Sequence, residues 1–347
     1  MAYKKDVKPA ITATPRRPEA AENAPCCCTD AGKLLSLQAE GERFSPFILQ
    51  RTNAHLPMRQ TRLLIAACLA LALAAIAPAA QAGGYKTEEL WIDNGPRRIY
   101  GVMASPEGAE GRLPVAIVAH GFNGTHHFAR AYFDTLCSLG YRCYAFDFPC
   151  GSLKSRSDSN TMDMSVRDEA ADIEAIVAHF RSRPDTDTAA IALIGESQGG
   201  LASALAASAL GDTVSRMVLI YPALCIPDNW NAAYKTEADI PDTTRVWGVP
   251  LGRRFFIEAR AIGVYATIGR YRGPVLLLHG DRDTVVPLDY SRRAEAVYPD
   301  ARLHVISGAG HGFGGKSREE AVSLVAAFLA PGATKKPAKP GAAPGKE

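Results

Sequence analysis

The sequence reads AAIALIGESQGGLASALAASAL from residue 189 to residue 210. The apolar run at 189–194 predicts a buried strand, and the small residues at 201–210 predict a helix. Between them, the letters GESQG match the sharp strand-to-helix turn called a nucleophile elbow. In such a turn the central serine has a strained backbone, and its hydroxyl projects at the sheet edge beside the helix N-terminus. The stretch therefore predicts a strand–turn–helix unit with Ser197 as a candidate nucleophile.

Length and composition limit the fold and the partners. The chain has 347 residues, of which 47% are hydrophobic, and a formal net charge of +3. A chain of this size can bury one large α/β domain or two smaller ones. No basic stripe with interleaved aromatic residues occurs, so the sequence gives no support for nucleic-acid binding.

A targeting signal is expected at residues 58–82. A short basic segment begins at Met58, an apolar run follows it, and the letters AQA stand at 80–82. This order indicates a secretory signal peptide that is cleaved after Ala82. The alternatives are a transmembrane anchor, for which the run is shorter than the ~20 residues of a span, and a lipoprotein site at Cys68. We expect a periplasmic or secreted protein without stable membrane insertion after cleavage.

Two terminal segments flank the expected domain. Residues 1–57 are polar and show no periodicity, which indicates either a disordered leader or an over-extended gene start with the true start at Met58. Residues 331–347 are rich in Pro, Ala, Gly and Lys and predict a disordered tail. The folded domain is therefore expected at 83–330.

Cysteines and histidines are the residues of this chain that could form a metal site or disulfides. Four of the eight cysteines fall in the expected domain: Cys137, Cys143, Cys150 and Cys225. In an exported protein they could pair in three ways, and buried thiols are the alternative. No spacing is typical of zinc, and the pair His126 and His127 has no carboxylate or cysteine at ligand distance in sequence. We predict no metal and no cofactor.

Strands and helices alternate along the domain. Residues 88–92 and 97–103 flank Asn94-Gly95, which predicts a β-hairpin with an Asn-Gly turn. Further strands are expected at 115–119, 141–146, 189–194, 216–221, 275–279 and 302–306, with helices at 128–139, 164–181, 290–297 and 318–329. This alternation implies an α/β fold with a mostly parallel, doubly wound sheet, to which the hairpin adds antiparallel strands at one edge.

Residues 223–272 interrupt the alternation. They contain three prolines and one fair helix, at 254–268. We interpret this segment as a lid over the carboxyl ends of the strands. Its aromatic residues Trp230, Tyr234 and Trp247 could line a substrate pocket or form the core of the lid.

A base for Ser197 is expected after a later strand. An acyl-transfer serine needs a base and an acid, and in this order of elements both follow the serine, each in a loop after a strand. The loop after the strand at 302–306 contains His311 between glycines, and we predict it as the base. His304 alternates within the strand and is better interpreted as a sheet residue.

The acid is expected in the loop after the strand at 275–279. This loop offers Asp281 and Asp283, and its position favours Asp283. Asp281 could pair with Arg282 or cap the turn.

Two backbone N–H groups are expected to form an oxyanion hole. One belongs to Gln198, directly after the candidate nucleophile. The other comes from the loop HGFNG at 120–124, where Phe122 is the predicted donor. His120 is expected to support this turn, because His311 already fills the place of the base.

The chain resembles the α/β-hydrolase family over about residues 88–330. Six motifs carry the resemblance: HGF at 120–122, FDF at 146–148, GESQGG at 195–200, YPA at 221–223, the loop around Asp283, and GAGHGF at 308–313. The most similar branch is that of cinnamoyl (feruloyl) and related carboxylic esterases. The resemblance implies an α/β-hydrolase fold with a lid.

For the site, the resemblance implies three side chains and two backbone donors. The matching positions are Ser197 as nucleophile, Asp283 as acid, His311 as base, and Phe122 with Gln198 as the oxyanion hole. Glu196 is a departure, because cinnamoyl esterases commonly carry His before the serine.

These observations together predict an exported serine carboxylic-ester hydrolase that acts through an acyl-enzyme. Its substrate is expected to be a small-molecule or polysaccharide-linked ester, with feruloyl, acetyl and short acyl groups all open. The alternatives are a serine peptidase of the prolyl-oligopeptidase type, a thioesterase or lipase, and a non-catalytic binding protein with a hydrolase fold. The oligomeric state is not indicated.

Overall fold

The computed structural model describes residues 84–158 and 160–332. The expected leader, the signal peptide at 58–82 and nearly all of the expected tail lie outside these ranges, so they stay predictions. Within these ranges, no helix has the length and apolar character needed to cross a membrane.

The described chain begins with a long antiparallel hairpin. Strand β1 (Tyr85–Asn94) pairs with β2 (Arg97–Pro106), and Asn94 still pairs with Arg97. The turn therefore consists of Gly95, which has a φ of 58°, and Pro96. The predicted Asn-Gly turn is wrong by one residue, since proline fixes its own φ and has no N–H for the strand ladder, which places it in the turn.

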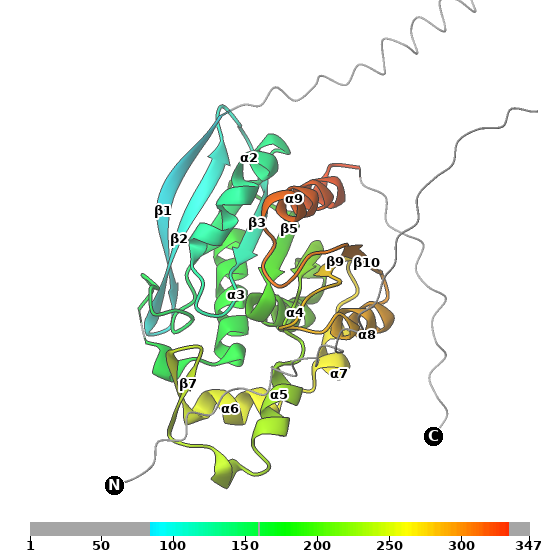
Figure 1. Cartoon of the computed structure of the whole chain (residues 1–347). Helices are drawn as coiled ribbons and strands as arrows, with labels where there is room; N and C mark the ends of the chain where they lie inside the picture. Colours follow the sequence, from blue (N-terminus) through cyan, green and yellow to red (C-terminus); the bar gives the residue numbers. More distant parts are fainter. Residues whose placement is uncertain (1–83, 159, 333–347) are drawn as a thin grey trace, which may run out of the picture. The chain divides into compact units, whose positions relative to one another are not determined.

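Eight strands of the described chain form the central sheet (Figure 1). Besides the hairpin they are β3 (Leu113–Ala119), β4 (Arg142–Phe146), β5 (Thr186–Glu196), β6 (Arg216–Ile220), β9 (Val275–Gly280) and β10 (Ala301–Ile306). Their order is β1-β2-β4-β3-β5-β6-β9-β10, and the six strands from β4 to β10 are parallel. The hairpin joins at β4 through an antiparallel pairing with β2. This confirms the predicted sheet.

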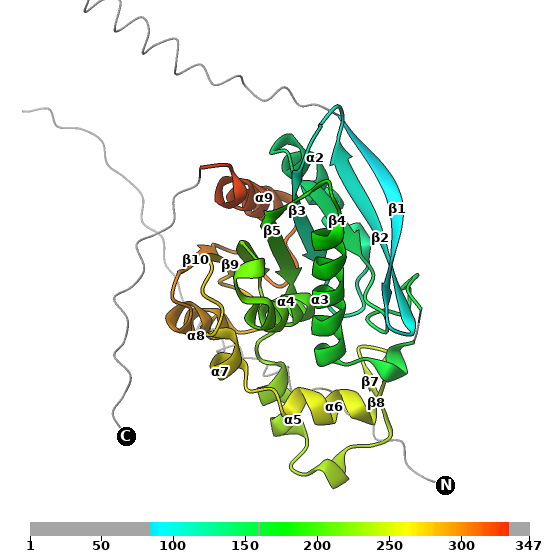
Figure 2. The same ribbon diagram turned by 180° about the vertical axis from the view of Figure 1, so that it is seen from behind.

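Helices cover both faces of the sheet (Figures 1 and 2). One core contains side chains of α3 (Val166–Ser182), α4 (Ser197–Leu210) and α8 (Asp289–Val297), and the other contains those of α2 (Arg130–Ser138) and α9 (Gly315–Leu329). Successive residues of β5 alternate between the two cores: Ile191 and Leu193 point to the first, Ala192 and Ile194 to the second. The part of β5 that is buried on both faces, residues 191–195, has to be apolar, as its sequence is.

The insertion between β6 and β9 is more complex than predicted. It contains α5 (Ile226–Ala233), the hairpin of β7 (Thr243–Val246) and β8 (Val249–Gly252), α6 (Arg253–Arg260) and α7 (Val264–Ile268). The predicted single helix at 254–268 is wrong, because the chain leaves the helical conformation before Gly263, whose ψ is 79°. Glycine has a low helix propensity and permits this break.

The insertion is fastened to α3 and the segment before it. Arg254 of α6 donates to both carboxylate oxygens of Asp168, at 2.7 and 3.0 Å. The Ser165 hydroxyl donates to Glu258, and the Thr161 hydroxyl donates to the carbonyl oxygen of Pro250 at 2.7 Å. These contacts fix β8 and α6 against the body of the domain.

The cysteines of the domain are buried. Cys137, Cys143 and Cys225 are thiols without a disulfide, and Cys150 is buried as well. Burial raises the pKa of the Cys225 thiol to about 11. The sequence left disulfides and buried thiols as alternatives, and Cys137, Cys143 and Cys225 are buried thiols.

Candidate active site

The elbow lies between β5 and α4. Strand β5 ends at Glu196, and Ser197 opens the helix with a φ of 49°, a left-handed conformation that is uncommon for serine. A Cβ at Gly195 would collide with the carbonyl oxygen of Gly199, and one at Gly199 would collide with that of His120. The pattern therefore needs glycine on both sides of the serine, as the sequence has it.

Three predicted side chains meet at this elbow. The Nε2 atom of His311 lies 3.0 Å from the hydroxyl oxygen of Ser197. On the other side of the ring, Nδ1 lies 2.8 Å from Oδ2 of Asp283. Because an ionised carboxylate can only accept, Nδ1 carries the hydrogen and Nε2 is free to accept from the serine. The arrangement allows proton transfer from Ser197 to His311.

Asp283 is held in one orientation by hydrogen bonds to both carboxylate oxygens. Its Oδ1 accepts the N–H groups of Val285 at 2.8 Å and Val286 at 2.9 Å. Its Oδ2, bound to His311, also lies 3.3 Å from Nε2 of His279. Burial raises the pKa of this carboxyl, but the hydrogen bonds from His279, His311 and Val286 outweigh burial and hold the pKa well below its usual range. Asp283 is therefore ionised at neutral pH.

The competing residues have structural contacts elsewhere. Asp281 accepts from the N–H of Gly308 at 2.6 Å and from the Ser307 hydroxyl at 3.3 Å, so it fixes the turn after β10. His304 is half-buried on β10, with Nε2 2.9 Å from Oε1 of Glu320.

The two predicted oxyanion donors lie beside the serine. Within residues 84–158 and 160–332, neither the N–H of Phe122 nor that of Gln198 donates to another group. The loop of Phe122 passes close to the elbow, since a Cβ on Gly121 would lie 3.0 Å from that of Ser197. Asn123, at a φ of 56°, anchors the loop by donating its N–H to the carbonyl oxygen of Gly151 at 2.9 Å. Both N–H groups are thus available to a ligand oxygen.

His120 supports this loop, as expected. Its Nε2 accepts the N–H of Phe148 at 3.0 Å, and its Nδ1 lies 2.7 Å from the carbonyl oxygen of Gly121. Burial lowers the pKa of the imidazole, which keeps it neutral. His126 is bound to Asp147 at 2.8 Å, and the described part of the chain contains no cluster of three or more metal-ligating side chains.

A family model described as the alpha/beta hydrolase family matches residues 116–323. The chain belongs to this family. No match is found among curated protein sequences. The prediction made from the sequence motifs is confirmed for the family and for the fold.

Solved structures of esterases share the fold of this α/β hydrolase. Est1E from Butyrivibrio proteoclasticus with bound ferulic acid has a TM-score of 0.63 and 26% identity, covering 69% of this chain and 97% of that one. An esterase from Pyrococcus furiosus has a TM-score of 0.53 and 22% identity, covering 71% and 91%. Acetyl xylan esterase 1 from Thermoanaerobacterium sp. has a TM-score of 0.53 and 19% identity, covering 71% and 84%. At these identities the latter two show the fold alone.

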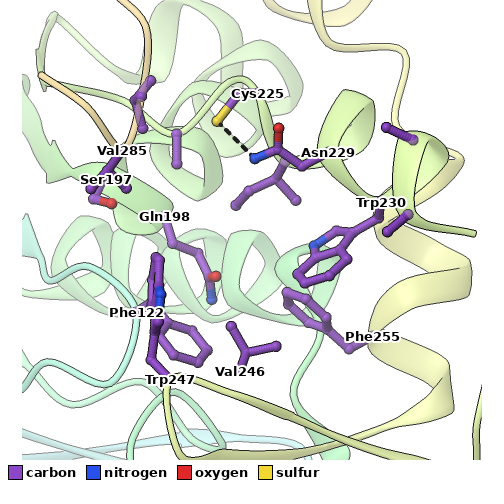
Figure 3. Close-up of a pocket in the computed structure, with 15 residues that line it drawn as sticks. Phe122, Ser197, Gln198, Cys225, Asn229, Trp230, Val246, Trp247, Phe255 and Val285 are labelled. Atoms are coloured by element: carbon purple, nitrogen blue, oxygen red, sulfur yellow. Dashed lines mark hydrogen bonds between the residues drawn. The ribbon is translucent and has the colours of Figure 1, made fainter. Parts of the chain in front are cut away.

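The α/β hydrolase has an apolar pocket beside Ser197, with a cavity volume of about 110 Å³ (Figure 3). Its lining comprises Phe122, Ser197, Gln198, Ala223, Cys225, Ile226, Asn229, Trp230, Ala232, Ala233, Val246, Trp247, Phe255, Val285 and Val286. Many of these residues belong to the insertion, which therefore forms much of the pocket wall. The few polar groups include the amide of Asn229, which donates to Cys225 Sγ at 3.4 Å. Such a pocket suits an apolar group next to the reacting carbonyl.

The aromatic residues of the insertion have two different locations, the pocket wall and the core of the insertion. Trp230 and Trp247 line the pocket, whereas Tyr234 packs against Trp230 and Phe256 inside the insertion. Trp247 is 61% exposed and contacts Phe122 edge-on, with ring centroids 5.6 Å apart. It therefore stands at the rim of the pocket beside the loop at 120–124.

The Gln198 side chain is held by Glu169 of α3 and by Met164, which lies just before α3. Its Nε2 donates to Oε1 of Glu169 on α3 at 2.8 Å and faces the sulfur of Met164 at 3.5 Å. Burial raises the pKa of Glu169 to about 8, so this carboxyl is protonated at neutral pH. The sequence offered no signal for this pair, since Glu169 lies within an ordinary amphipathic helix.

Proposed function

We propose that this α/β hydrolase is a serine carboxylic-ester hydrolase that acts through an acyl-enzyme. The observation that carries the proposal is the chain of hydrogen bonds from Asp283 through His311 to Ser197 at the edge of an apolar pocket. Each member has the donor or acceptor role that acyl transfer requires.

The reaction follows from these roles. His311 Nε2 takes the proton of the Ser197 hydroxyl while its oxygen attacks the ester carbonyl, and the N–H groups of Phe122 and Gln198 stabilise the oxyanion. Collapse of the tetrahedral intermediate breaks the bond to the alkoxy oxygen, which takes the proton from His311 and leaves as the alcohol. Water, activated by His311, then attacks the acyl-enzyme and releases the acid and free Ser197.

The proposed substrate is an ester with an apolar acyl group that fits the pocket. The apolar lining next to Ser197 supports this, as does the neighbour solved with bound ferulic acid. Feruloyl, acetyl and short acyl esters, free or linked to polysaccharide, are the classes to compare. We also propose a periplasmic or secreted location, which rests on the sequence pattern at 58–82.

Hydrolysis of p-nitrophenyl acetate and labelling by a fluorophosphonate test the function. Ser197→Ala is expected to abolish both. Ser203→Ala is the matched control, because Ser203 lies in the same helix and its buried hydroxyl has no hydrogen-bond partner in the described structure. An active and labelled Ser197→Ala variant would overturn the proposal.

A panel of substrates then identifies the acyl group: methyl ferulate, acetylated xylan and p-nitrophenyl esters of increasing chain length. Peptide and thioester substrates test whether the chain is instead a peptidase or a thioesterase.

A further inference from the structure

Glu196, directly before the proposed nucleophile, contacts both sides of the site. Its Oε1 accepts the backbone N–H of Gly121 at 3.2 Å. Its Oε2 accepts the Tyr221 hydroxyl at 2.7 Å. One carboxylate therefore joins the loop after β3 to the residue that follows β6.

The contact with Gly121 fixes the loop that carries an oxyanion donor. Gly121 directly precedes Phe122, and its backbone packs against the Cβ of Ser197. The Gly121 N–H and the Phe122 N–H belong to the two peptide planes on either side of the Gly121 α-carbon. Glu196 holds the first plane, and the bonds of Asn123 N–H to Gly151 and of Gly124 N–H to the Gly121 carbonyl oxygen hold the loop after it. Together these contacts keep the Phe122 N–H in place.

The contact with Tyr221 fixes a ring that packs against the base. The Tyr221 ring centroid lies 4.7 Å from that of His311 and 4.7 Å from that of Phe313. Tyr221 has a φ of 36°, which is unusual for a large side chain and needs support from its surroundings. Its hydroxyl bond to Glu196 provides such support.

The charges around Glu196 add an electrostatic role. Glu196 interacts electrostatically with Tyr221, His311 and Arg318 on α9. It also interacts with Tyr132 on α2. Burial raises the pKa of the Glu196 carboxyl, while the hydrogen bonds from Tyr221 and Gly121, the charge of His311 when it is protonated and the charge of Arg318 oppose this. Attraction between two charges is mutual, so an ionised Glu196 favours the imidazolium that forms when His311 takes the serine proton.

We infer that Glu196 is a positioning residue, which couples the oxyanion loop to Tyr221 and His311 and aligns both with Ser197. The inference rests on the proposed function, since it assigns Glu196 a part in the same reaction. It also gives a role to the position at which this chain departs from the histidine of cinnamoyl esterases.

Steady-state kinetics with p-nitrophenyl acetate test the inference, with active sites counted by fluorophosphonate titration. Glu196→Ala is expected to lower kcat about tenfold to hundredfold and leave KM within about threefold, as for a small misplacement of catalytic groups. Glu196→Gln keeps groups that can bond to Gly121 and Tyr221, so it is expected to recover most of kcat. Because Gln lacks the charge, the acidic limb of its kcat/KM profile should move to lower pH.

Tyr221→Phe is the companion variant, because it removes only the hydroxyl and keeps the ring against His311. It is expected to lower kcat by severalfold, and its effect should be smaller when Glu196 is already alanine. Should Glu196→Ala fail to fold, Glu196→Gln and Tyr221→Phe carry the test through the pH profile and kcat.

The inference is wrong if kcat per titrated site and the pH profile stay unchanged while only the melting temperature falls, as for a purely structural residue. Ser197→Ala separates the two proposals. If that variant is inactive and unlabelled while the Glu196 variants match the wild type, the inference fails and the proposed function stands. If Ser197→Ala is active, the proposed function fails first.

Discussion

The Nε2 atom of His311 lies 3.0 Å from the Ser197 hydroxyl oxygen, although 114 residues separate the two along the chain. The sheet explains this closeness. Ser197 follows β5 and His311 follows β10, and parallel strands all end at the same edge of the sheet. Asp283 follows β9, next to β10, and reaches the far side of the imidazole.

The first prediction separates the two candidate acids. Asp283→Asn is expected to lower kcat about 10³- to 10⁴-fold, because an amide at this position disturbs the Nδ1–H tautomer that the base needs. Asp281→Asn is the matched control and should stay within about fivefold, because the Asp281 carboxylate binds the turn at Ser307 and Gly308. Kinetics with p-nitrophenyl acetate at pH 7.5 check both. A larger loss in Asp281→Asn would reverse the assignment.

The second prediction concerns the pH dependence of stability. Glu169 has a folded-state pKa raised to about 8 by burial, so the folded chain holds a proton that the unfolded chain loses near pH 4.5. The free energy of unfolding therefore falls as pH rises from about 4.5 to 8. Glu169→Gln keeps an acceptor for Gln198 but has no carboxyl that titrates. The variant therefore lacks this fall in the free energy of unfolding. Its stability relative to wild type should rise between pH 5 and pH 9, by on the order of a few kcal/mol.

Urea unfolding at pH 5, 7 and 9 measures this difference. Asp172, whose pKa is also raised by burial, to about 6, contributes in the same direction in both proteins. The informative quantity is thus the difference between variant and wild type. If the free energy of unfolding of variant and wild type changed with pH in parallel over the whole range, the pKa of Glu169 would be the same in the folded and unfolded chains.

The elbow and the order of the site residues were predictable because they depend on local patterns. Apolar runs marked the buried strands, and the loops after them held His311 and Asp283. The parallel sheet then brings these loops together whatever their separation in sequence. By contrast, the Asn-Gly turn was misplaced by one residue because Pro96 takes the second turn position.

Contacts between distant segments were not predictable. The hydrogen bonds of Glu196 to Gly121 and Tyr221 join three loops, and no periodicity in any of them indicates the other two. The insertion was also only outlined, because its short elements are set by packing against α3 and by contacts such as Arg254 with Asp168. Short segments carry little intrinsic preference, so tertiary contacts decide their form.

The third prediction tests how the insertion is attached. A Cβ on Gly252 would collide with the backbone carbonyl oxygen of Met162, so Gly252→Ala should displace β8 and destabilise the fold by about 1–3 kcal/mol. Gly263→Ala is the control within the same insertion, because a Cβ there has no neighbour within 4 Å. It should stay within about 0.5 kcal/mol of wild type. Equal stability of the two variants in urea unfolding would contradict the close packing at Gly252.

The last prediction concerns the rim of the pocket. Trp247 has a φ of 47° and is 61% exposed, so Trp247→Gly relieves a strained backbone and should change the melting temperature little. The same variant loses the aromatic wall beside Phe122. For a p-nitrophenyl ester with a medium acyl chain, kcat/KM should fall about tenfold, which corresponds to about 1.4 kcal/mol of lost contact, while the acetyl ester should change by less than threefold.

Trp91→Ala, which removes an exposed tryptophan on β1 that does not line the pocket, should leave kcat/KM for both esters unchanged. An equal loss for both esters in Trp247→Gly would mean that Trp247 acts on the oxyanion loop and not on the acyl group.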